Sequence, residues 1–137
     1  MPDIISQLHQ RSDFSRFLKL LRQVDLVTIL QNYGPWTIFA PSDAAFDRLP
    51  PGSVDGWRHD VARLNDILMY HIVEGELLWE DLTEMSEVIT IEGDTVAIDT
   101  HDGLAISGAK VTEADIEADN GVIHVIDHVI MPAHVAD

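Results

Sequence analysis

The sequence contains no cysteine. This absence excludes disulfide bonds, thiol catalysis and zinc sites built on thiolates. It does not distinguish a secreted protein from a cytosolic one. No apolar run reaches the length of a membrane span, because charged residues interrupt each one. Charges also break up the first thirty residues, so we expect no signal peptide there and no membrane insertion.

Basic residues are scarce. The chain has 8 Lys and Arg against 24 Asp and Glu, which gives a formal net charge of -16. Residues 1–73 hold eight acids and seven bases, whereas residues 74–137 hold sixteen acids and only Lys110 as a base. This anionic second half repels phosphate backbones and anionic lipids, so nucleic acid and membrane surfaces are not expected partners. Charged partners should be basic, although acidic runs are usually a solvated, solubilising surface.

Length and periodicity predict one domain, residues 1–137, of the α+β class. Apolar residues recur at three- and four-residue steps in the early segments, whereas later segments alternate and are separated by turn residues. Helices therefore precede strands instead of alternating with them. We predict helices over 14–24, 26–30, 43–49, 61–68 and 77–82, and strands over 36–39, 70–73, 88–91, 96–99, 104–106, 110–116 and 122–131.

The last predicted strand carries polar residues among apolar ones. Asn120-Gly121 is a turn dipeptide, a β-branched run follows it, and Pro132 is expected to end the ladder. With a period of two, His124 and His128 lie on one face and Asp127 on the other, and each face is apolar apart from these residues. A strand that is apolar on both faces is usually buried on both, so we expect His124 and Asp127 to be held by internal hydrogen bonds.

Histidine and carboxylate spacing gives little support to a metal or a cofactor, and we predict neither. His124 and His128 would lie about 13 Å apart on a strand, too far for one ion. Residues 115–121 place oxygen ligands at alternate positions, but the glycine comes late and Ile126 stands where a calcium-binding loop needs glutamate. Ser42 lacks the flanking glycines of a nucleophile elbow and suits a helix N-cap better.

Three segments resemble the fasciclin domain family. Residues 37–46 match its first signature box, Tyr70-His71 its central tyrosine-histidine pair, and residues 120–132 its second box, in the right order and spacing. The resemblance implies a fasciclin-like α+β fold, with N-terminal helices packed on a mainly antiparallel β-wedge or sandwich. It also implies a non-enzymatic adhesion module that binds a cell-surface or matrix protein or a glycan.

The resemblance further implies where partners bind. In animal members, integrin recognition is assigned to an aspartate-isoleucine pair before the second box and to the tyrosine-histidine segment, which here are Asp115-Ile116 and Tyr70-His71. Glu117 departs from the usual apolar neighbour. The alternative is that Ile116 is core and Asp115 surface, since adjacent strand residues point to opposite faces, and that one residue of the tyrosine-histidine pair is buried.

Structural roles are expected for four polar residues of the two boxes. We expect Thr37, Ser42, His124 and Asp127 to be hydrogen-bonding anchors, with Asp127 joining the boxes through the Thr37 or Ser42 hydroxyl, because an unpaired buried carboxylate is costly. By resemblance the domain should be monomeric and extracellular, at the cell surface or periplasmic. The alternatives are a small-ligand or cation-binding domain and, less favoured, a hydrolase that uses carboxylates of residues 74–119.

Overall fold

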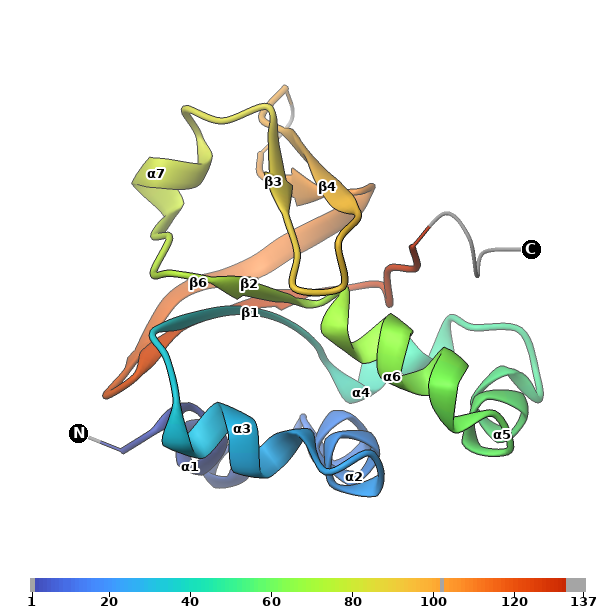
Figure 1. Cartoon of the computed structure of the whole chain (residues 1–137). Coiled ribbons are helices and arrows are strands. Elements are labelled where there is room, and N and C mark those ends of the chain that lie inside the picture. Colours follow the sequence, from blue (N-terminus) through green and yellow to red (C-terminus); the bar gives the residue numbers. More distant parts are fainter. Residues whose placement is uncertain (1, 102, 133–137) are drawn as a thin grey trace.

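Most of the helices lie on one side of a curved sheet, whereas the short helix of residues 79–82 lies on the other side, beside the far strands of the same sheet (Figure 1). The structure is a computed structural model that describes residues 2–101 and 103–132. The helices are α1 (Ile4–Gln10), α2 (Ser15–Gln23), α3 (Leu26–Asn32), α4 (Asp43–Asp47), α5 (Ser53–Arg58), α6 (Val61–Met69) and α7 (Trp79–Leu82). The strands are β1 (Trp36–Pro41), β2 (Ile72–Glu74), β3 (Glu87–Ile89), β4 (Thr95–Asp99), β5 (Ala105–Ile106), β6 (Ala109–Ala118) and β7 (Gly121–Ile126).

The strands are ordered β2-β1-β7-β6-β5-β4-β3 in a single sheet. Neighbouring strands are antiparallel except for β1 and β7, which run parallel with Trp36 opposite Gly121 and Pro41 opposite Ile126. The two signature boxes therefore lie side by side as neighbouring strands of the sheet. The predicted α+β class and mainly antiparallel sheet are confirmed.

The alternation of β7 separates two hydrophobic cores. Ile123 and Val125 face α1, α2 and α6, where they pack with Ile38 of β1 and the buried helix residues. Ile126, on the opposite face, packs with Phe39 and with residues of β4 and β5. Burial of all six residues of β7 accounts for its apolar character on both faces.

Several predicted boundaries were wrong. Helix α1 was not predicted, although the Asp3 carboxylate caps it by accepting the Ser6 N–H at 2.8 Å. Helix α5 was also not predicted, because it contains Gly56 and buries only Trp57. Tyr70 ends α6 instead of beginning a strand, and β7 ends at Ile126, before the predicted stop at Pro132. None of the helices in residues 2–101 and 103–132 is long and apolar enough to cross a membrane.

Candidate functional site

Asp115 stands at an irregularity in β6. The pairing of β6 with β7 shifts register between Glu113 and Ile116, and Asp115 has a φ of 58°. Aspartate is one of the few non-glycine residues that adopt this left-handed conformation readily. The bulge leaves the Asp115 side chain exposed, whereas Ile116 is half-buried and packs against the core beneath the helices. The two residues therefore face different sides of the sheet.

The Asp115 carboxylate is held at the start of α7. Its Oδ1 accepts a hydrogen bond from the Trp79 N–H at 2.8 Å. Trp79 is 37% exposed. An exposed tryptophan residue and a carboxylate whose second oxygen takes no part in that hydrogen bond thus lie next to each other on the surface.

His124 lies directly beneath this surface and is fully buried. Its Nδ1 accepts the Asp115 N–H at 3.2 Å, so its Nε2 carries the proton and donates to the Leu77 carbonyl at 2.7 Å. The ring stacks on Phe39 with centroids 6.0 Å apart. Burial lowers the pKa of His124, although the Leu77 carbonyl and the charge of Asp115 favour the protonated ring. A neutral His124 therefore fixes the backbone of the Asp115 bulge.

Thr37 completes the attachment of the same segment. Its hydroxyl donates to the Gly75 carbonyl at 2.7 Å and accepts the Leu77 N–H at 2.8 Å. We call residues 75–79 the Leu77 loop. The loop is bound to β1 through Thr37, to β7 through His124 and to β6 through Asp115, so residues from three neighbouring strands determine where Trp79 lies.

Tyr70 and His71 are buried at the end of α6, with 5% and 0% of their surface exposed. The Tyr70 hydroxyl donates to the Thr95 carbonyl at 2.7 Å. His71 accepts the Ile130 N–H at Nε2 over 3.1 Å, so Nδ1 is protonated and donates to the Ile67 carbonyl at 2.7 Å. Both side chains have internal partners and no accessible face. Direct contact of this pair with a partner stays a prediction, and it would require the covering segments to move.

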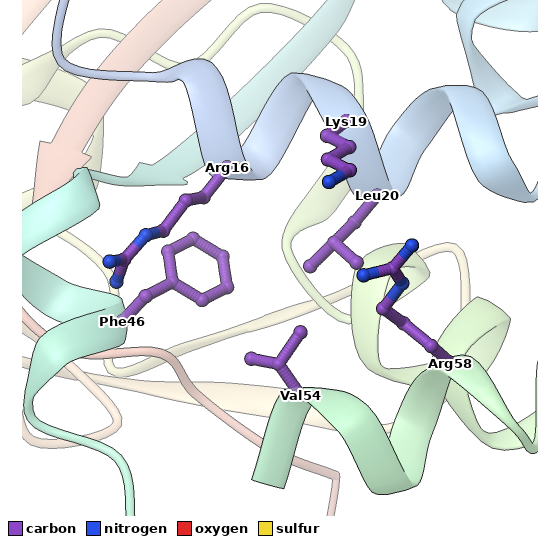
Figure 2. A pocket seen from close by; sticks show the side chains of 6 residues that line it. All are labelled: Arg16, Lys19, Leu20, Phe46, Val54 and Arg58. Atoms are coloured by element: carbon purple, nitrogen blue, oxygen red, sulfur yellow. The ribbon is translucent and has the colours of Figure 1, made fainter. Parts of the chain in front are cut away.

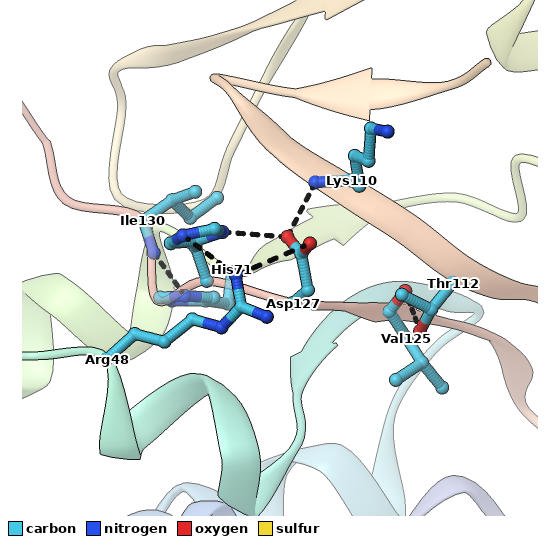
Figure 3. Close-up of polar contacts among 8 residues, drawn as sticks. Arg48, His71, Lys110, Thr112, Val125, Asp127 and Ile130 are labelled. Atoms are coloured by element: carbon cyan, nitrogen blue, oxygen red, sulfur yellow. Dashed lines mark hydrogen bonds and ion pairs between the residues drawn. The ribbon is translucent and has the colours of Figure 1, made fainter.

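Burial also controls the charge of His71. It lowers the pKa of the ring to about 4, although the hydrogen bond to the Ile67 carbonyl favours protonation. The neutral ring holds the segment after β7 against the end of α6 (Figure 3).

Asp127 lies in a polar cluster at the end of β7 (Figure 3). Its carboxylate accepts the Lys110 N–H at 2.8 Å and the His128 Nδ1–H at 2.8 Å, with the Arg48 guanidinium 3.9 Å away. Burial opposes ionisation, but the hydrogen bonds from His128 and Lys110 and the charges of His128 and Arg48 outweigh it and lower the pKa of Asp127. Asp127 thus joins β6, β7 and α4.

The expected link from Asp127 to the Thr37 or Ser42 hydroxyl was wrong. Thr37 bonds to the Leu77 loop instead. Ser42 occupies the N-cap position of α4, but its side chain makes no capping hydrogen bond, and its backbone N–H reaches the Ile126 carbonyl at 3.4 Å. The first box is joined to the second mainly by the backbone ladder between β1 and β7.

No group of three or more His, Asp or Glu side chains within residues 2–101 and 103–132 is arranged to hold a metal ion. Two of the possible calcium ligands have other partners. Asp115 accepts the Trp79 N–H, and Asn120 accepts the Ile4 N–H and donates to the Leu30 carbonyl. These oxygens and amides serve the fold.

The pairing of the two boxes across β1 and β7 agrees with a family comparison, in which the fasciclin domain model matches residues 12–132. The chain belongs to the fasciclin domain family. It is 42% identical over 131 residues to the uncharacterized protein sll1735 of Synechocystis sp. (strain ATCC 27184 / PCC 6803 / Kazusa). The aligned residues make up 96% of this chain and 98% of that protein.

Other relatives are longer proteins that contain a similar domain. Human periostin is 32% identical over 93% of this chain, which corresponds to 16% of periostin. The cell surface glycolipoprotein MPB83 of Mycobacterium bovis is 34% identical over 83% of this chain and 51% of its own length. In structure, a FAS1 domain pair from the insect cell adhesion molecule Fasciclin I matches 99% of this fasciclin domain with a TM-score of 0.77 at 18% identity, covering 53% of that chain.

Sequence reasoning placed Asp115 in the candidate site but missed Trp79 and the Leu77 loop. Trp79 stands in an acidic stretch with Glu76, Glu80 and Asp81, where a large aromatic residue has no obvious core to fill. That isolation was the available signal, because exposed aromatic residues often mark contact surfaces. The link between Trp79 and Asp115 spans 36 residues, so only the fold brings the two together.

Proposed function

We propose that this fasciclin domain is a non-enzymatic adhesion module that binds a protein or glycan partner through the surface formed by Asp115 and Trp79. The observation that carries the proposal is the anchored bulge, in which the Asp115 carboxylate accepts the Trp79 N–H at 2.8 Å beside an exposed indole. Tryptophan is enriched among residues that dominate binding energy, and a fixed side chain loses little entropy on binding.

Charge and burial support this surface over the tyrosine-histidine pair. Glu113 and Glu117 flank Asp115 on β6 and are exposed, so a basic or hydroxyl-rich partner surface would complement the site. Glu113 is already paired with Arg11 at 2.6 Å, so Asp115 and Glu117 are the carboxylates of β6 that have no ion pair within the described residues. Tyr70 and His71 are buried and bond to the Thr95 carbonyl, the Ile67 carbonyl and the Ile130 N–H, so they do not contribute to this surface.

Family membership supports the adhesion role and its location. The name of MPB83 places that protein at the cell surface, and Fasciclin I is called an insect cell adhesion molecule. We therefore propose an extracellular, cell-surface or periplasmic domain that acts as a monomer toward its partner. Catalysis by carboxylates of residues 74–119 is not part of this proposal.

Cell attachment to the immobilised domain tests the proposal. The variant Asp115→Asn removes the charge but keeps an oxygen that accepts the Trp79 N–H and a residue type that tolerates positive φ. Trp79→Ala removes the indole and leaves the backbone contact. Each variant should reduce attachment at least fivefold, which is about 1 kcal/mol of binding free energy.

Glu87→Gln is the matched control, because Glu87 is an exposed carboxylate on β3 and its loss changes the net charge by the same amount. Attachment to this variant should equal that of the unmodified domain. Unfolding curves for all three variants establish that each is folded. Unchanged attachment with Asp115→Asn and Trp79→Ala would refute the assignment of this surface, and no attachment to the unmodified domain from any cell type would refute the adhesion role.

A further inference from the structure

Three cationic side chains surround an apolar hollow in the helical half of the molecule (Figure 2). The hollow has a volume of about 260 Å³ and is lined by Arg16, Lys19 and Leu20 of α2, Phe46 of α4, and Val54 and Arg58 of α5. It lies in the part of the chain that is nearly neutral, away from the acidic strands. Its charge is therefore opposite to that of the molecule as a whole.

Two of the three cations have no carboxylate partner among the described residues. Arg16 is paired with Asp47 at 2.6 Å. Lys19 and Arg58 make no ion pair with any residue that the structure describes, even though the chain contains 24 carboxylates. Arg58 is instead oriented by an exchange of hydrogen bonds with Gln23, each 3.2 Å long. Oriented but unpaired cations at the rim of a hollow are suited to an anionic group.

The floor of the hollow is apolar. Leu20 and Phe46 are 3% and 5% exposed, so they form a fixed surface that belongs to the core. Val54 is half-buried and closes the side formed by α5. At about 30 Å³ for each water in the liquid, the hollow holds the equivalent of about nine waters. That is the size of a short aliphatic chain, smaller than a typical drug-sized ligand.

We propose that this hollow binds a small amphiphilic anion, a carboxylate or phosphate on a short apolar chain. The apolar chain would lie on Leu20 and Phe46, and the head group would contact Lys19 and Arg58. Two effects would favour binding: apolar surface of the ligand and the hollow is removed from water, and the two unpaired cations acquire a counter-charge. Repulsion by the acidic residues 74–137 would disfavour such a ligand on the strands.

Titration of the full 137-residue chain with hexanoate, followed by amide chemical shifts, tests the proposal. Saturable shifts should appear in α2, α4 and α5, and hexyl phosphate should produce the same pattern. Hexanol and inorganic phosphate each lack one half of the ligand, and both should bind at least tenfold more weakly. Comparison of inorganic phosphate with hexyl phosphate shows whether the anionic group alone is enough.

The double variant Lys19→Gln with Arg58→Gln should weaken hexanoate binding by about tenfold, because each partly exposed charge contact is worth roughly a factor of three. Arg22→Gln with Lys110→Gln is the matched control. It removes the same charge from exposed positions outside the hollow, one of them on α2, and should leave the affinity unchanged.

Three results would overturn the proposal. One is the absence of saturable shifts at the highest hexanoate concentration that leaves the protein folded. Another is equal binding of hexanol and hexanoate, which would indicate apolar partition without recognition of charge. The third is an equal loss of affinity in the two double variants, which would indicate a general effect of net charge. None of these results bears on the surface formed by Asp115 and Trp79, so failure here is distinguishable from failure of the adhesion role.

Discussion

Acidification should destabilise the domain through His71. The ring is fully buried, and its pKa is lowered from 6.5 to about 4. Above pH 6.5 the ring is neutral in both the folded and the unfolded chain, so its contribution to stability is complete. Between pH 6.5 and about 4 the unfolded chain binds a proton that the folded chain does not, so unfolding becomes more favourable as the pH falls. Below about 4 both states are protonated and the loss is complete.

The magnitude follows from the shift. At about 1.4 kcal/mol per pKa unit, the whole loss is about 3 kcal/mol, and most of it should be present at pH 4.5 relative to pH 7.5. This is a large part of the roughly 5–15 kcal/mol that stabilises an ordinary domain. Its structural origin is the Ile130 N–H, which donates to Nε2 at 3.1 Å and would face another donor in the protonated ring.

Urea unfolding of the domain and of His71→Gln at the two pH values measures the effect. His124 and the carboxylates also respond to pH, so the informative quantity is the difference between the two proteins. The variant should be less stable at pH 7.5 but should lose about 2–3 kcal/mol less on acidification. His9→Gln, at an exposed position on α1, should keep the full pH dependence. If His71→Gln cannot be folded, ring-proton titration of the unmodified domain gives the pKa of His71 directly. A value near 6.5, or equal pH dependence in the two proteins, would refute this reasoning.

Two further predictions concern the neutral-pH stability of the fold, measured by urea unfolding. Thr37→Val should lower the free energy of unfolding by about 1–3 kcal/mol, because it leaves the Leu77 N–H and the Gly75 carbonyl without their hydroxyl partner. Thr37→Ser keeps the hydroxyl and should lower it less. Equal losses in the two variants would mean that the hydroxyl is unimportant. Gly121→Ala should lower the free energy of unfolding by more than about 3 kcal/mol, because the added Cβ would overlap the Trp36 carbonyl. Gly56→Ala, in an open part of α5, should be neutral or stabilising by up to about 1 kcal/mol. Similar effects at the two glycines would contradict the close approach of β1 and β7.

Local pattern was enough to predict much of the sheet. The alternation in residues 122–126 correctly separates Ile123 and Val125 from Val122, His124 and Ile126, because a strand has only two faces. The same reasoning failed for Tyr70 and His71. Their β-like neighbours Ile72 and Val73 suggested an extended segment, but the helical hydrogen bond from the Tyr70 N–H to the Asp66 carbonyl prevails.

Contacts between distant segments could not be predicted from pattern. The sequence shows that Thr37 and His124 are polar residues in apolar strands, but not that both bind the Leu77 loop, because loop position depends on how three strands are ordered. Asp115 illustrates the same limit. A strand pattern places it on the surface, whereas its left-handed backbone and its contact with Trp79 depend on the register shift against β7.

The parallel pairing of β1 and β7 also has a consequence for how the chain acquires its structure during synthesis. Trp36 and Gly121 are partners, so the whole intervening chain must be made before this pair of strands can form. Until then Ile38 and the helix residues of the same core lack their contacts with Ala118, Ile123 and Val125. Contacts between such distant residues slow folding and leave apolar surface exposed in the meantime. The acidic stretch that separates the two boxes, made before β7, would keep this incomplete chain soluble by charge repulsion.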